Sequence, residues 1–461
     1  MLSVKANLLA SRGHEVSIVV LRLKGRKPFF PIDPSVNIVD LSAPYLSLPG
    51  HPSSANATSD SPRSTVSSAA GSASNPASCS ASTESSASPV SSTAGSTPGP
   101  ASCSARTESS AAPISSAVGS ASSPATGSAR MEGVASVPAT MAAERLKGSV
   151  RERLSRVVEM LDPDVCVSLC GPEVRILPAV AGGRPCVAEY HFSHDKFYRK
   201  YGGIFLYPYA WLRTHMLERA VSEYDCMVTL TEHDLPIWKR HCRRVERIFN
   251  PVTTPPGQVS RLAEKRMIAV GRLEDQKNFK DLVSAWSIVA ERCPDWRLEI
   301  FGEGKLEHAL RSQIARLGLT GSVILRGVVK DIASEYSNSS ALLMTSLHEG
   351  FPLALVEASS FGLPLISYDC PTGPSEIIVD AGDGGGVGNV PTATLDQAAG
   401  NTPNGYLVPV GDVRTLADRI CRIASDDNLR LRLGAASKAS SHRFTPETII
   451  SAWEHLFSSL L

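Results

Sequence analysis

The pattern of apolar positions divides the chain into short apolar runs separated by stretches with helical spacing. In the first part, the apolar runs predict strands, and the segments between them place apolar residues three or four positions apart, as helices do. The strands are predicted at residues 16–21, 36–41, 165–169, 185–191 and 225–231, and the helices at 2–12, 143–161 and 204–221. Strands that alternate with helices are typical of a parallel, doubly wound sheet.

The second part repeats this alternation with greater regularity. Pro352 suits the first turn of a helix, and Gly362 suits the position just past a helix end. Strands are predicted at residues 267–271, 297–301, 323–326, 341–344 and 365–368, and helices at 278–292, 305–317, 332–337, 353–361 and 445–461. The chain therefore contains two α/β halves, and it crosses from one to the other near residue 252.

A segment of different composition interrupts the first half. Residues 46–139 consist mainly of Ser, Ala, Pro, Gly and Thr, so they cannot bury enough apolar surface to form a core, and we expect disorder. The segment starting at Pro76 recurs from Pro100, but the repeat lacks the apolar positions that a solenoid would stack. Cys79 and Cys103 occupy equivalent positions of this repeat, and a disulfide between them is not expected in a reducing compartment.

Composition excludes several classes of protein. The 461 residues allow two or three domains, and a formal net charge of +1 argues against general nucleic-acid binding. No apolar run approaches the roughly 18 residues of a membrane span, and the first residues lack the layout of a signal peptide, so we expect a cytoplasmic protein. The ten cysteines form no CxxC pair and no Cys/His cluster with metal-ligand spacing.

Two carboxylates flank the start of the helix predicted at residues 353–361. Glu349 precedes the helix, where free backbone N–H groups gather around an anion, so this turn suits a phosphorylated ligand. Glu357 lies inside the helix, where its carboxylate can accept two hydrogen bonds from a vicinal diol such as a ribose. The alternative is that Glu349 is only a favourable helix charge and Glu357 a solvated surface residue.

A cationic loop follows the strand at residues 267–271. Arg272 and Lys277 lie on this loop, at the carboxyl edge of the predicted sheet, where ligands bind. Two cations are enough to neutralise a diphosphate through charge-assisted hydrogen bonds, although a solvated turn with two surface cations is the alternative. No Asp-x-Asp motif follows a strand, so we expect no metal and assign the role of a divalent ion to the cationic loop.

Together these motifs resemble the E-x7-E signature and motif order of retaining glycosyltransferases of family 4. The resemblance covers about residue 140 to the end and the first forty or so residues. It implies an α/β GT-B fold, in which two doubly wound Rossmann-like domains face a cleft. It divides the chain into the start of an N-terminal acceptor-side domain (1–45), the disordered insertion (46–139), the rest of that domain (140–252), a nucleotide-sugar domain (253–444) and a helix returning to the first domain (445–461).

The resemblance also implies roles for individual residues. It maps Arg272 and Lys277 onto the pyrophosphate and leaving group, Glu349 onto the hydroxyls of the donor sugar, and Glu357 onto the ribose. His191 matches a histidine that faces the acceptor, although a hydrogen-bonded core or surface histidine is equally compatible with the sequence. The implied catalytic residues are Glu349, Arg272, Lys277 and His191, and the implied donor contacts are Gly271, Arg272, Lys277, Gly302, Val329, Ser346, Glu349, Gly350, Phe351 and Glu357.

Several of these assignments have a structural alternative. The turn containing Gly302 and the turn before Val329 are also compatible with purely structural turns, and Ser346 with a cap of its loop. Gly350 and Phe351 are assigned through their backbone amides.

The implied function is transfer, with retention, of a hexosyl or N-acetylhexosaminyl group. The donor is a nucleoside-diphosphate sugar, foremost a UDP-sugar, and the acceptor is a glycan or a lipid-linked molecule in surface polysaccharide synthesis. A basic segment before residue 252 suits either peripheral contact with the inner membrane surface or a solvated helix face, and it contains Lys239, Arg240, Arg243, Arg244 and Arg247. The rivals are an inactive sugar-nucleotide-binding or scaffold protein and a GT-B epimerase or phosphorylase.

Two departures from the family pattern stand out. Family members begin with a strand and a glycine-rich loop, whereas Met1 falls directly in the first predicted helix. We therefore expect an N-terminally truncated first domain, because that first strand is central in a doubly wound sheet. Residues 382–403 interrupt what is a short turn in relatives and are expected to form a loop insertion.

Overall fold

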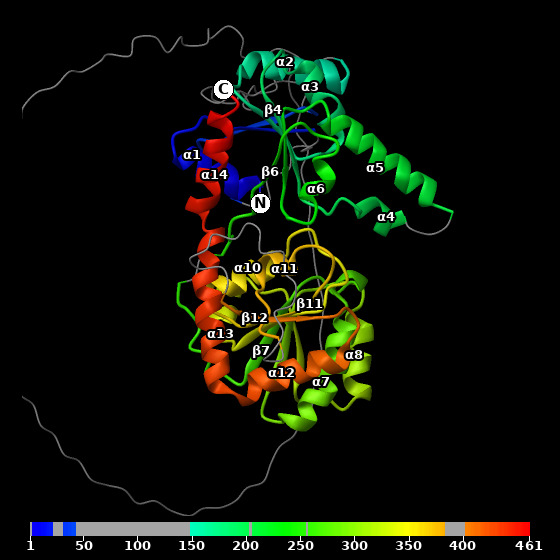
Figure 1. Ribbon diagram of the computed structural model, residues 1–461, viewed down its shortest axis with the longest axis vertical. Coiled ribbons are helices and arrows are strands. Elements are labelled where there is room, and N and C mark those ends of the chain that lie inside the picture. Colours follow the sequence, from blue (N-terminus) through cyan, green and yellow to red (C-terminus); the bar gives the residue numbers. More distant parts are fainter. Residues whose placement is uncertain (1, 22–30, 43–147, 202–204, 255–256, 383–401) are drawn as a thin grey trace, which may run out of the picture. The chain divides into compact units, whose positions relative to one another are not determined.

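The computed structural model describes residues 2–21, 31–42, 148–201, 205–254, 257–382 and 402–461 (Figure 1). The segment expected to be disordered, with its repeat and Cys79 and Cys103, lies outside the described residues, as does most of the insertion expected at 382–403. The described strands form sheets of two, four and six strands. Every strand pair in them is parallel, as the alternation of strands and helices predicted.

The first part of the chain builds the two smaller sheets. One has the order β1-β2 and the other the order β3-β4-β5-β6. The elements are α1 (Leu2–Ser11), β1 (Ser17–Val20), β2 (Asn37–Asp40), α2 (Val150–Leu161), β3 (Cys166–Ser168), α3 (Leu177–Val180), β4 (Cys186–Tyr190), α4 (Lys196–Tyr201), α5 (Tyr207–Val221), β5 (Cys226–Thr229), α6 (Leu235–Trp238) and β6 (Val245–Arg247). A short 3-10 helix, Pro172–Arg175, precedes α3.

The two small sheets are not hydrogen-bonded to each other among the described residues. They nevertheless share an apolar cluster, in which Val39 and Leu41 pack with Val157 of α2 and Cys166 of β3. Packing of side chains, rather than a continuous ladder of backbone hydrogen bonds, therefore joins β2 to the four-stranded sheet in this part of the structure.

Among the described residues, two helices of the first part begin later than the apolar pattern predicts, while residues 143–147 of the first lie outside the described residues. α2 begins at Val150, because Ser149 accepts a hydrogen bond from the N–H of Glu152 while the Glu152 side chain accepts one from the Ser149 N–H. This reciprocal capping box fixes a helix start. α5 begins at Tyr207 with Pro208 in its first turn, so the prediction of a helix from residue 204 was wrong for the described residues 205 and 206.

The second part builds the six-stranded sheet, with the order β12-β11-β10-β7-β8-β9. The strands predicted from the sequence agree with β7–β11 to within one residue at each end. In contrast, no helix was predicted at the positions of α12 and α13. The elements are β7 (Arg266–Val270), α7 (Phe279–Arg292), β8 (Arg297–Phe301), α8 (Glu307–Arg316), β9 (Val323–Gly327), α9 (Ile332–Ser337), β10 (Ala341–Met344), α10 (Leu353–Ser360), β11 (Leu365–Tyr368), α11 (Pro374–Ile377), β12 (Gly405–Val408), α12 (Val413–Ser425), α13 (Asp427–Ser440) and α14 (Pro446–Ser458). A 3-10 helix, Asp275–Lys277, precedes α7, and another, Ser441–Phe444, precedes α14.

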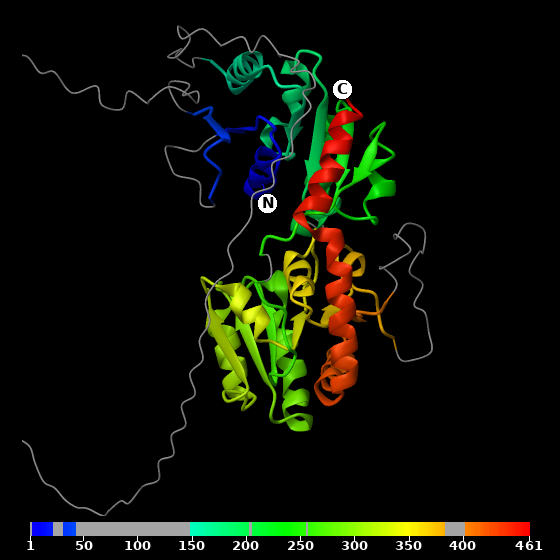
Figure 2. The ribbon, with the colours of Figure 1, turned by 90° about the vertical axis from the view of Figure 1, so that its left-hand side faces the viewer.

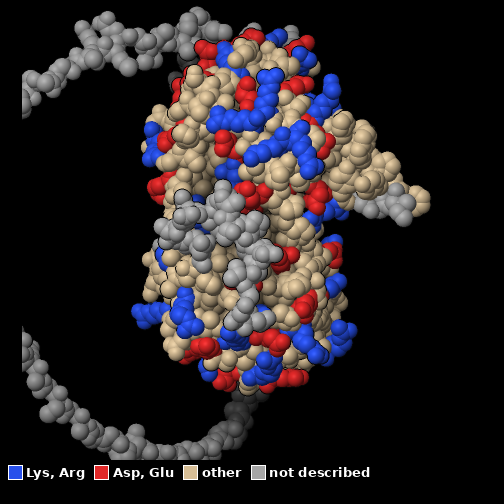
Figure 3. Space-filling view, in the orientation of Figure 1, with Lys and Arg blue, Asp and Glu red and all other residues tan. Residues whose placement is uncertain are grey.

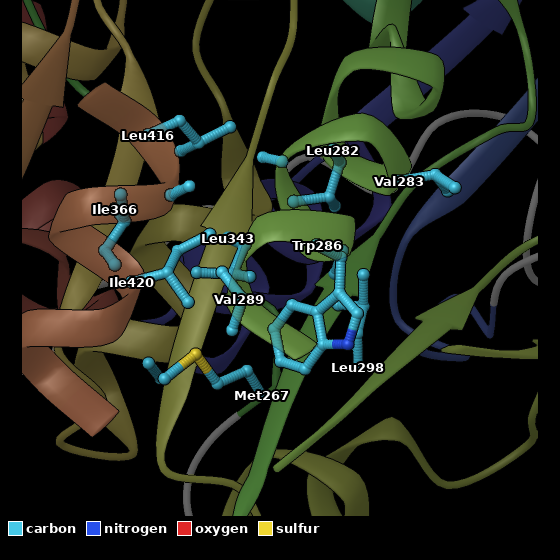
Figure 4. Packing of buried hydrophobic residues seen from close by; sticks show 14 of the residues in the cluster. Met267, Leu282, Val283, Trp286, Val289, Leu298, Leu343, Ile366, Leu416 and Ile420 are labelled. Carbon is cyan, nitrogen blue, oxygen red and sulfur yellow. The ribbon is translucent and has the colours of Figure 1, made fainter. Parts of the chain in front are cut away.

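The core of the second part lies between this sheet and the helices α7 and α12. Trp286 of α7 is fully buried and belongs to the same cluster as Met267, Leu298 and Leu343 of the central strands (Figure 4). Ile420 of α12 completes the cluster from a neighbouring helix. Parallel strands covered on both faces read as uninterrupted apolar runs, and this is why the sequence located them so closely.

The last helix contacts elements from the beginning of the chain. α14 follows α13 after the short 3-10 helix, as Figure 2 shows in red. Its Trp453 packs in a cluster with Val187 of β4 and Val228 of β5, and its Glu454 forms an ion pair with Arg12 at 2.9 Å. Across the part of the chain that the structure describes, no helix combines the length and apolar character needed to cross a bilayer.

Candidate functional site

The candidate site lies where the strand order of the six-stranded sheet changes direction. The chain leaves β7 towards β8 and β9 on one side and returns to β10 on the other side of β7. In open parallel sheets, ligands bind at the carboxyl ends of the strands that flank such a point. Here these strands are β7 and β10, and the loops that follow them are residues 271–278 and 345–352.

Hydrogen bonds join these two loops. Gln276 donates from its side-chain Nε2 to the carbonyl oxygen of His348 at 2.8 Å, and its own carbonyl oxygen accepts from the Leu347 N–H at 2.8 Å. Thr345 Oγ1 donates to the carbonyl oxygen of Lys277 at 3.0 Å. The loops therefore hold one fixed arrangement, and the sequence offers no signal that pairs Gln276 with His348.

Two of the predicted site residues form an ion pair. Lys277 Nζ lies 2.6 Å from Glu349 Oε1, and 17% and 9% of the two side chains are exposed. The aliphatic part of Lys277 crosses Gly271, where an added Cβ would lie 3.1 Å from Lys277 Cε. Thr372 Oγ1 donates to the carbonyl oxygen of Glu349. The structure thus places a cation that can bind phosphate beside a carboxylate that can bind hydroxyl groups.

Arg272 is placed differently from Lys277. Its side chain is 67% exposed and pairs with Glu274 of the same loop at 3.1 Å. An exposed ion pair of this kind contributes only about 0–1 kcal/mol, so little opposes a change of rotamer. Of the two predicted cations, the structure therefore brings Lys277, and not Arg272, against Glu349.

Glycines allow the loops after β7, β8 and β9 to touch. A Cβ added at Gly302, where φ is +134°, would lie 2.0 Å from the carbonyl oxygen of Gly271. One added at Gly304 would lie 2.5 Å from the carbonyl oxygen of Leu273. The Gly302 N–H also donates to the carbonyl oxygen of Gly327 at 2.8 Å. Close backbone approach accounts for both glycines of this turn, and a contact to a nucleotide stays a prediction.

Glu357 is not the solvated surface residue of the alternative interpretation. Its carboxylate accepts hydrogen bonds from the hydroxyls of Thr253, Thr254 (3.4 Å) and Tyr336 (3.1 Å). Burial raises the pKa of Glu357, and the three donated hydrogen bonds partly oppose that rise. Val329 is half-buried and packs against the apolar cluster that contains Tyr336. Hydroxyl groups therefore surround this carboxylate, and sequence reasoning missed all three of them.

Ser346 carries an unsatisfied hydroxyl. The residue is fully buried, and its Oγ has no hydrogen-bond partner among the described residues. The alternative interpretation, that Ser346 only caps its loop, is therefore not supported by the structure. Leaving a buried hydroxyl without a partner costs about 1–3 kcal/mol, so this group is a candidate ligand contact.

The start of α10 lies against the loop that follows β4. A Cβ added at Gly350 would lie 2.4 Å from the carbonyl oxygen of His191. The Phe351 ring is buried and stacks on Phe249, with the ring centroids 5.4 Å apart, so only its backbone is available to a ligand. Pro352 is the N-cap residue of α10, one position earlier than predicted, while Gly362 has the positive φ (+74°) expected just past the helix end.

His191 is held by a buried carboxylate. Its Nε2 lies 3.2 Å from Glu189 Oε1, and 23% of the His191 side chain is exposed. Glu189 also pairs with Lys5 of α1. Burial alone would raise the pKa of Glu189, but the charge of Lys5 and hydrogen bonds from His191 and Lys5 outweigh it and lower that pKa to about 2. An ionised Glu189 therefore orients the imidazole of His191.

Comparison with known proteins relates the chain to glycosyltransferases. Residues 255–440 match the profile of the family described as Glycosyl transferases group 1. An uncharacterized glycosyltransferase of Haemophilus influenzae is 27% identical over 51% of this chain and 62% of that protein. The amylovoran biosynthesis glycosyltransferase AmsD of Erwinia amylovora is 30% identical over 42% of this chain and 48% of that protein. The chain thus spans less than two thirds of the length of either relative.

Solved structures share the fold at low sequence identity. HepE of Anabaena, in complex with UDP, is 18% identical over 67% of this chain and 82% of that chain, with a TM-score of 0.52. A TarM variant of S. aureus, in complex with fondaparinux, α-GlcNAc-glycerol and UDP, is 18% identical over 67% of this chain and 58% of that chain, with a TM-score of 0.51. The fold is therefore GT-B, α/β with parallel sheets, and residues 255–440 form a group 1 glycosyl transferase domain.

Proposed function

We propose that this protein is a retaining glycosyltransferase that moves a hexosyl or N-acetylhexosaminyl group from a nucleoside-diphosphate sugar, foremost a UDP-sugar, to a glycan or lipid-linked acceptor in surface polysaccharide synthesis. The observation that carries the proposal is the pairing of Lys277 with Glu349 at the point where the parallel sheet changes direction. A cation beside a carboxylate at this edge suits a ligand in which a diphosphate is joined to a sugar.

The diphosphate binds to the loop after β7 and the start of α10. Lys277 exchanges Glu349 for a phosphate oxygen, and Arg272 leaves its exposed pair with Glu274 to reach the second phosphate. The backbone amides of Gly350 and Phe351 add donors at a helix start, where the dipole favours an anion. These two cations neutralise the leaving group without a metal ion.

The sugar and the nucleoside bind on either side of the diphosphate. Glu349 accepts hydrogen bonds from hydroxyls of the sugar. The Ser346 hydroxyl, which has no partner in the structure, forms a hydrogen bond with the sugar nucleotide. A ribose diol takes the place that the hydroxyls of Thr253 and Tyr336 now occupy on Glu357. The base lies against the loops that contain Gly302 and Val329. The UDP complexes of HepE and TarM support uridine as the nucleoside.

His191 faces the acceptor. Glu189 fixes its orientation, and the carbonyl oxygen of His191 lies next to Gly350, so the imidazole belongs to the region where the sugar is transferred. With retention by front-side attack, the bond from the anomeric carbon to the phosphate oxygen breaks while the acceptor oxygen attacks from the same face. The leaving phosphate takes the acceptor proton.

The start of α5 suits contact with the membrane that holds a lipid-linked acceptor. Exposed apolar side chains gather there, with Phe205, Leu206 and Trp211 exposed by 95%, 51% and 54%, and Figure 3 shows an uncharged surface over this element. Aromatic side chains favour the membrane–water interface. The described cysteines are all free, which suits the reducing cytoplasmic side.

The basic segment before residue 252 is a weaker candidate for membrane contact. Lys239, Arg240 and Arg243 are exposed. Arg244 instead pairs with Glu246, and Arg247 pairs with two carboxylates, including that of Glu376. Only part of this segment therefore offers free charge to a lipid head group.

Titration calorimetry with UDP, GDP and ADP, followed by assays with their hexose and N-acetylhexosamine conjugates, tests the proposal. We expect UDP to bind best, binding to persist in EDTA, and slow hydrolysis or transfer of one UDP-sugar. Failure of every nucleoside diphosphate to bind would refute it.

An inactive sugar-nucleotide-binding protein is the second candidate. One observation favours it: among the described residues of the first part, no strand pairs with both β1 and β3, so the sheets β1-β2 and β3-β4-β5-β6 are separate. Tight binding of UDP together with no transfer and no hydrolysis of any UDP-sugar would select it.

A further inference from the structure

A second cluster of chemically active side chains lies in the first part of the chain, outside the candidate donor site. It brings together His194 from the loop after β4, Glu218 from α5 and His241 from the segment after α6 (helices labelled in Figure 1). His194 Nε2 lies 2.9 Å from Glu218 Oε1, and His241 Nε2 lies 3.4 Å from the same oxygen. The nearest ligand atoms of the three residues all lie within 4.8 Å of one another.

Packing orients both imidazoles towards Glu218. The two rings are nearly parallel, with centroids 6.4 Å apart and an interplanar angle of 15°. His194 also packs edge-to-face on the buried ring of Trp238, with centroids 5.0 Å apart. The side chains of His194 and Glu218 are each 15% exposed and that of His241 is 30% exposed. The cluster is therefore shielded from most of the solvent but open on one side.

We propose that His194, Glu218 and His241 bind a Zn²⁺ ion. Tetrahedral zinc with bonds of about 2.0–2.1 Å requires ligand atoms about 3.3 Å apart, and the two distances to Glu218 Oε1 lie on either side of that value. Two imidazole nitrogens and one carboxylate oxygen suit Zn²⁺ or another first-row divalent metal, whereas Mg²⁺ and Ca²⁺ prefer oxygen ligands throughout. A water molecule completes the coordination on the open side.

His215 is close to this cluster but does not belong to the ligand set. Its Nδ1 approaches the other oxygen of Glu218, Oε2, at 3.5 Å, and its side chain is 57% exposed. Its ring stacks on Trp211, with centroids 5.3 Å apart and an interplanar angle of 6°. His215 is therefore a matched control, because it is a histidine that contacts the same carboxylate from outside the site.

The ion connects three segments that are distant in the sequence. It ties α5 and the segment after α6 to the loop after β4, and this loop also carries His191. Because folding must precede assembly of the three ligands, zinc binds the folded state in preference to the unfolded state and stabilises it. The role is structural, and the ion takes no part in the proposed sugar transfer.

The test uses the full chain, with any affinity tag removed, after treatment with a chelator and exchange into metal-free buffer. Calorimetric titration with ZnCl₂ should show one equivalent bound, and zinc should raise the melting temperature. Titration with CoCl₂ should give the intense visible absorption of a tetrahedral site. X-ray absorption at the zinc edge should show imidazole nitrogen and carboxylate oxygen ligands and no sulfur.

Variants assign the binding to these residues. His194→Ala, His241→Ala and the conservative Glu218→Gln should each weaken zinc binding by at least about tenfold, since even the loss of an outer-shell partner typically costs 10–100-fold. His215→Ala should bind zinc within about twofold of the parent protein. Circular dichroism checks that each metal-free variant is folded, and Glu218→Gln keeps a side chain that can hydrogen-bond both histidines.

Any one of the following three results would overturn the proposal that zinc binds at this cluster, and a fourth would overturn the assignment of its ligands. The three results are the absence of stoichiometric zinc binding, binding by all three ligand variants as tight as that of the parent protein, and sulfur ligands at the zinc edge. A loss of binding in His215→Ala equal to that in His241→Ala would also contradict the assigned ligand set. UDP binding by metal-free protein is a separate measurement, so failure of the zinc site and failure of the donor site are distinguishable.

Discussion

Replacing Lys277 with methionine removes the cation of the candidate donor site and keeps most of the aliphatic chain that lies over Gly271. The variant loses a charge-assisted hydrogen bond to Glu349 of 2.6 Å, a kind of interaction worth about 1.5–3 kcal/mol. Glu349, whose side chain is only 9% exposed, then carries an unpaired charge. Breaking a fully buried pair costs about 3–5 kcal/mol, and this pair is slightly open to water.

We therefore expect the free energy of unfolding to fall by about 2 kcal/mol, and UDP affinity to fall at least about tenfold, or about 1.4 kcal/mol. The interpretation of residues 271–278 as a solvated turn predicts no loss of stability at all. The double variant Lys277→Met with Glu349→Gln removes both charges, so it should recover most of the stability while UDP binding stays weak. Lys280→Ala, at an exposed lysine of the adjacent helix, is the control.

Differential scanning fluorimetry and calorimetric titration with UDP measure the two effects separately. A loss of about 2 kcal/mol corresponds to a decrease in melting temperature of about 4–8 °C for a domain of this size. The reasoning is wrong if Lys277→Met melts with the parent protein and binds UDP equally well. It is also wrong if the double variant is no more stable than Lys277→Met, because the unpaired carboxylate is then not the cause.

Four further predictions follow from the structure. Glu357→Gln should weaken UDP binding about tenfold, as measured by calorimetry. Burial raises the pKa of Glu357, so the charge of its carboxylate opposes folding at pH values above that pKa. The variant should therefore be no less stable than the parent protein at neutral pH. The pKa of Glu189 is lowered from 4.5 to about 2, so its ionised form stabilises the folded protein fully at pH values above about 4.5, and this stabilisation is lost as the pH falls towards 2. When Glu189→Gln is titrated with acid, its free energy of unfolding should not show this loss. Gly302→Ala should destabilise the protein in urea by more than Gly318→Ala, because both glycines have positive φ but only the Gly302 Cβ would meet a backbone oxygen, at 2.0 Å. His191→Ala should lower kcat for the best UDP-sugar at least about tenfold without changing UDP affinity, and an equal loss of affinity would place His191 on the donor instead.

The sequence located the central strands of the second part because burial on both faces makes most of their positions apolar, with few polar exceptions such as Glu299 and Ser367. The predicted strands agree with β7–β11 to within one residue at each end. Turn chemistry placed the end of α10 correctly, since Gly362 has the positive φ that ends helices. Pro352 precedes that helix instead of occupying its first turn, a shift of one residue that the same chemistry allows.

Two helices before α14 escaped the sequence patterns for different reasons. α12 has apolar side chains at Leu416, Ile420 and Ile423, with the spacing of one helix face, so the signal was present in the sequence. α13 buries mainly small residues, such as Gly434, Ala436 and Ser437, which give little contrast between a buried and an exposed face. The apolar face of α13 is limited to Leu429, Leu433 and Ala436, so apolar periodicity recovers α12 more readily than α13.

The candidate sites depend on contacts that only tertiary structure shows. The sequence singled out Glu357, but the hydroxyl donors around it come from Thr253, Thr254 and Tyr336, which precede it by 21 to 104 residues. The sequence did not indicate the cluster at Glu218 for the same reason, because its two proposed histidine partners, His194 and His241, lie 24 residues before it and 23 residues after it, far beyond the spacing of local metal motifs.

If the proposed function holds, the ion pair at the candidate donor site implies an order in the interactions of the sugar nucleotide. In the structure, Glu349 Oε1 accepts a hydrogen bond from Lys277, so part of the acceptor capacity of this carboxylate is already used before a sugar hydroxyl binds. A diphosphate competes for the same ammonium group, so its binding releases the carboxylate. The released charge is costly while it stays unpaired and buried, and hydroxyls of the sugar are the groups available to pair with it. Under the proposed function, phosphate binding and sugar recognition are therefore coupled through Lys277, and we expect a nucleotide without its sugar to realise only part of the interaction.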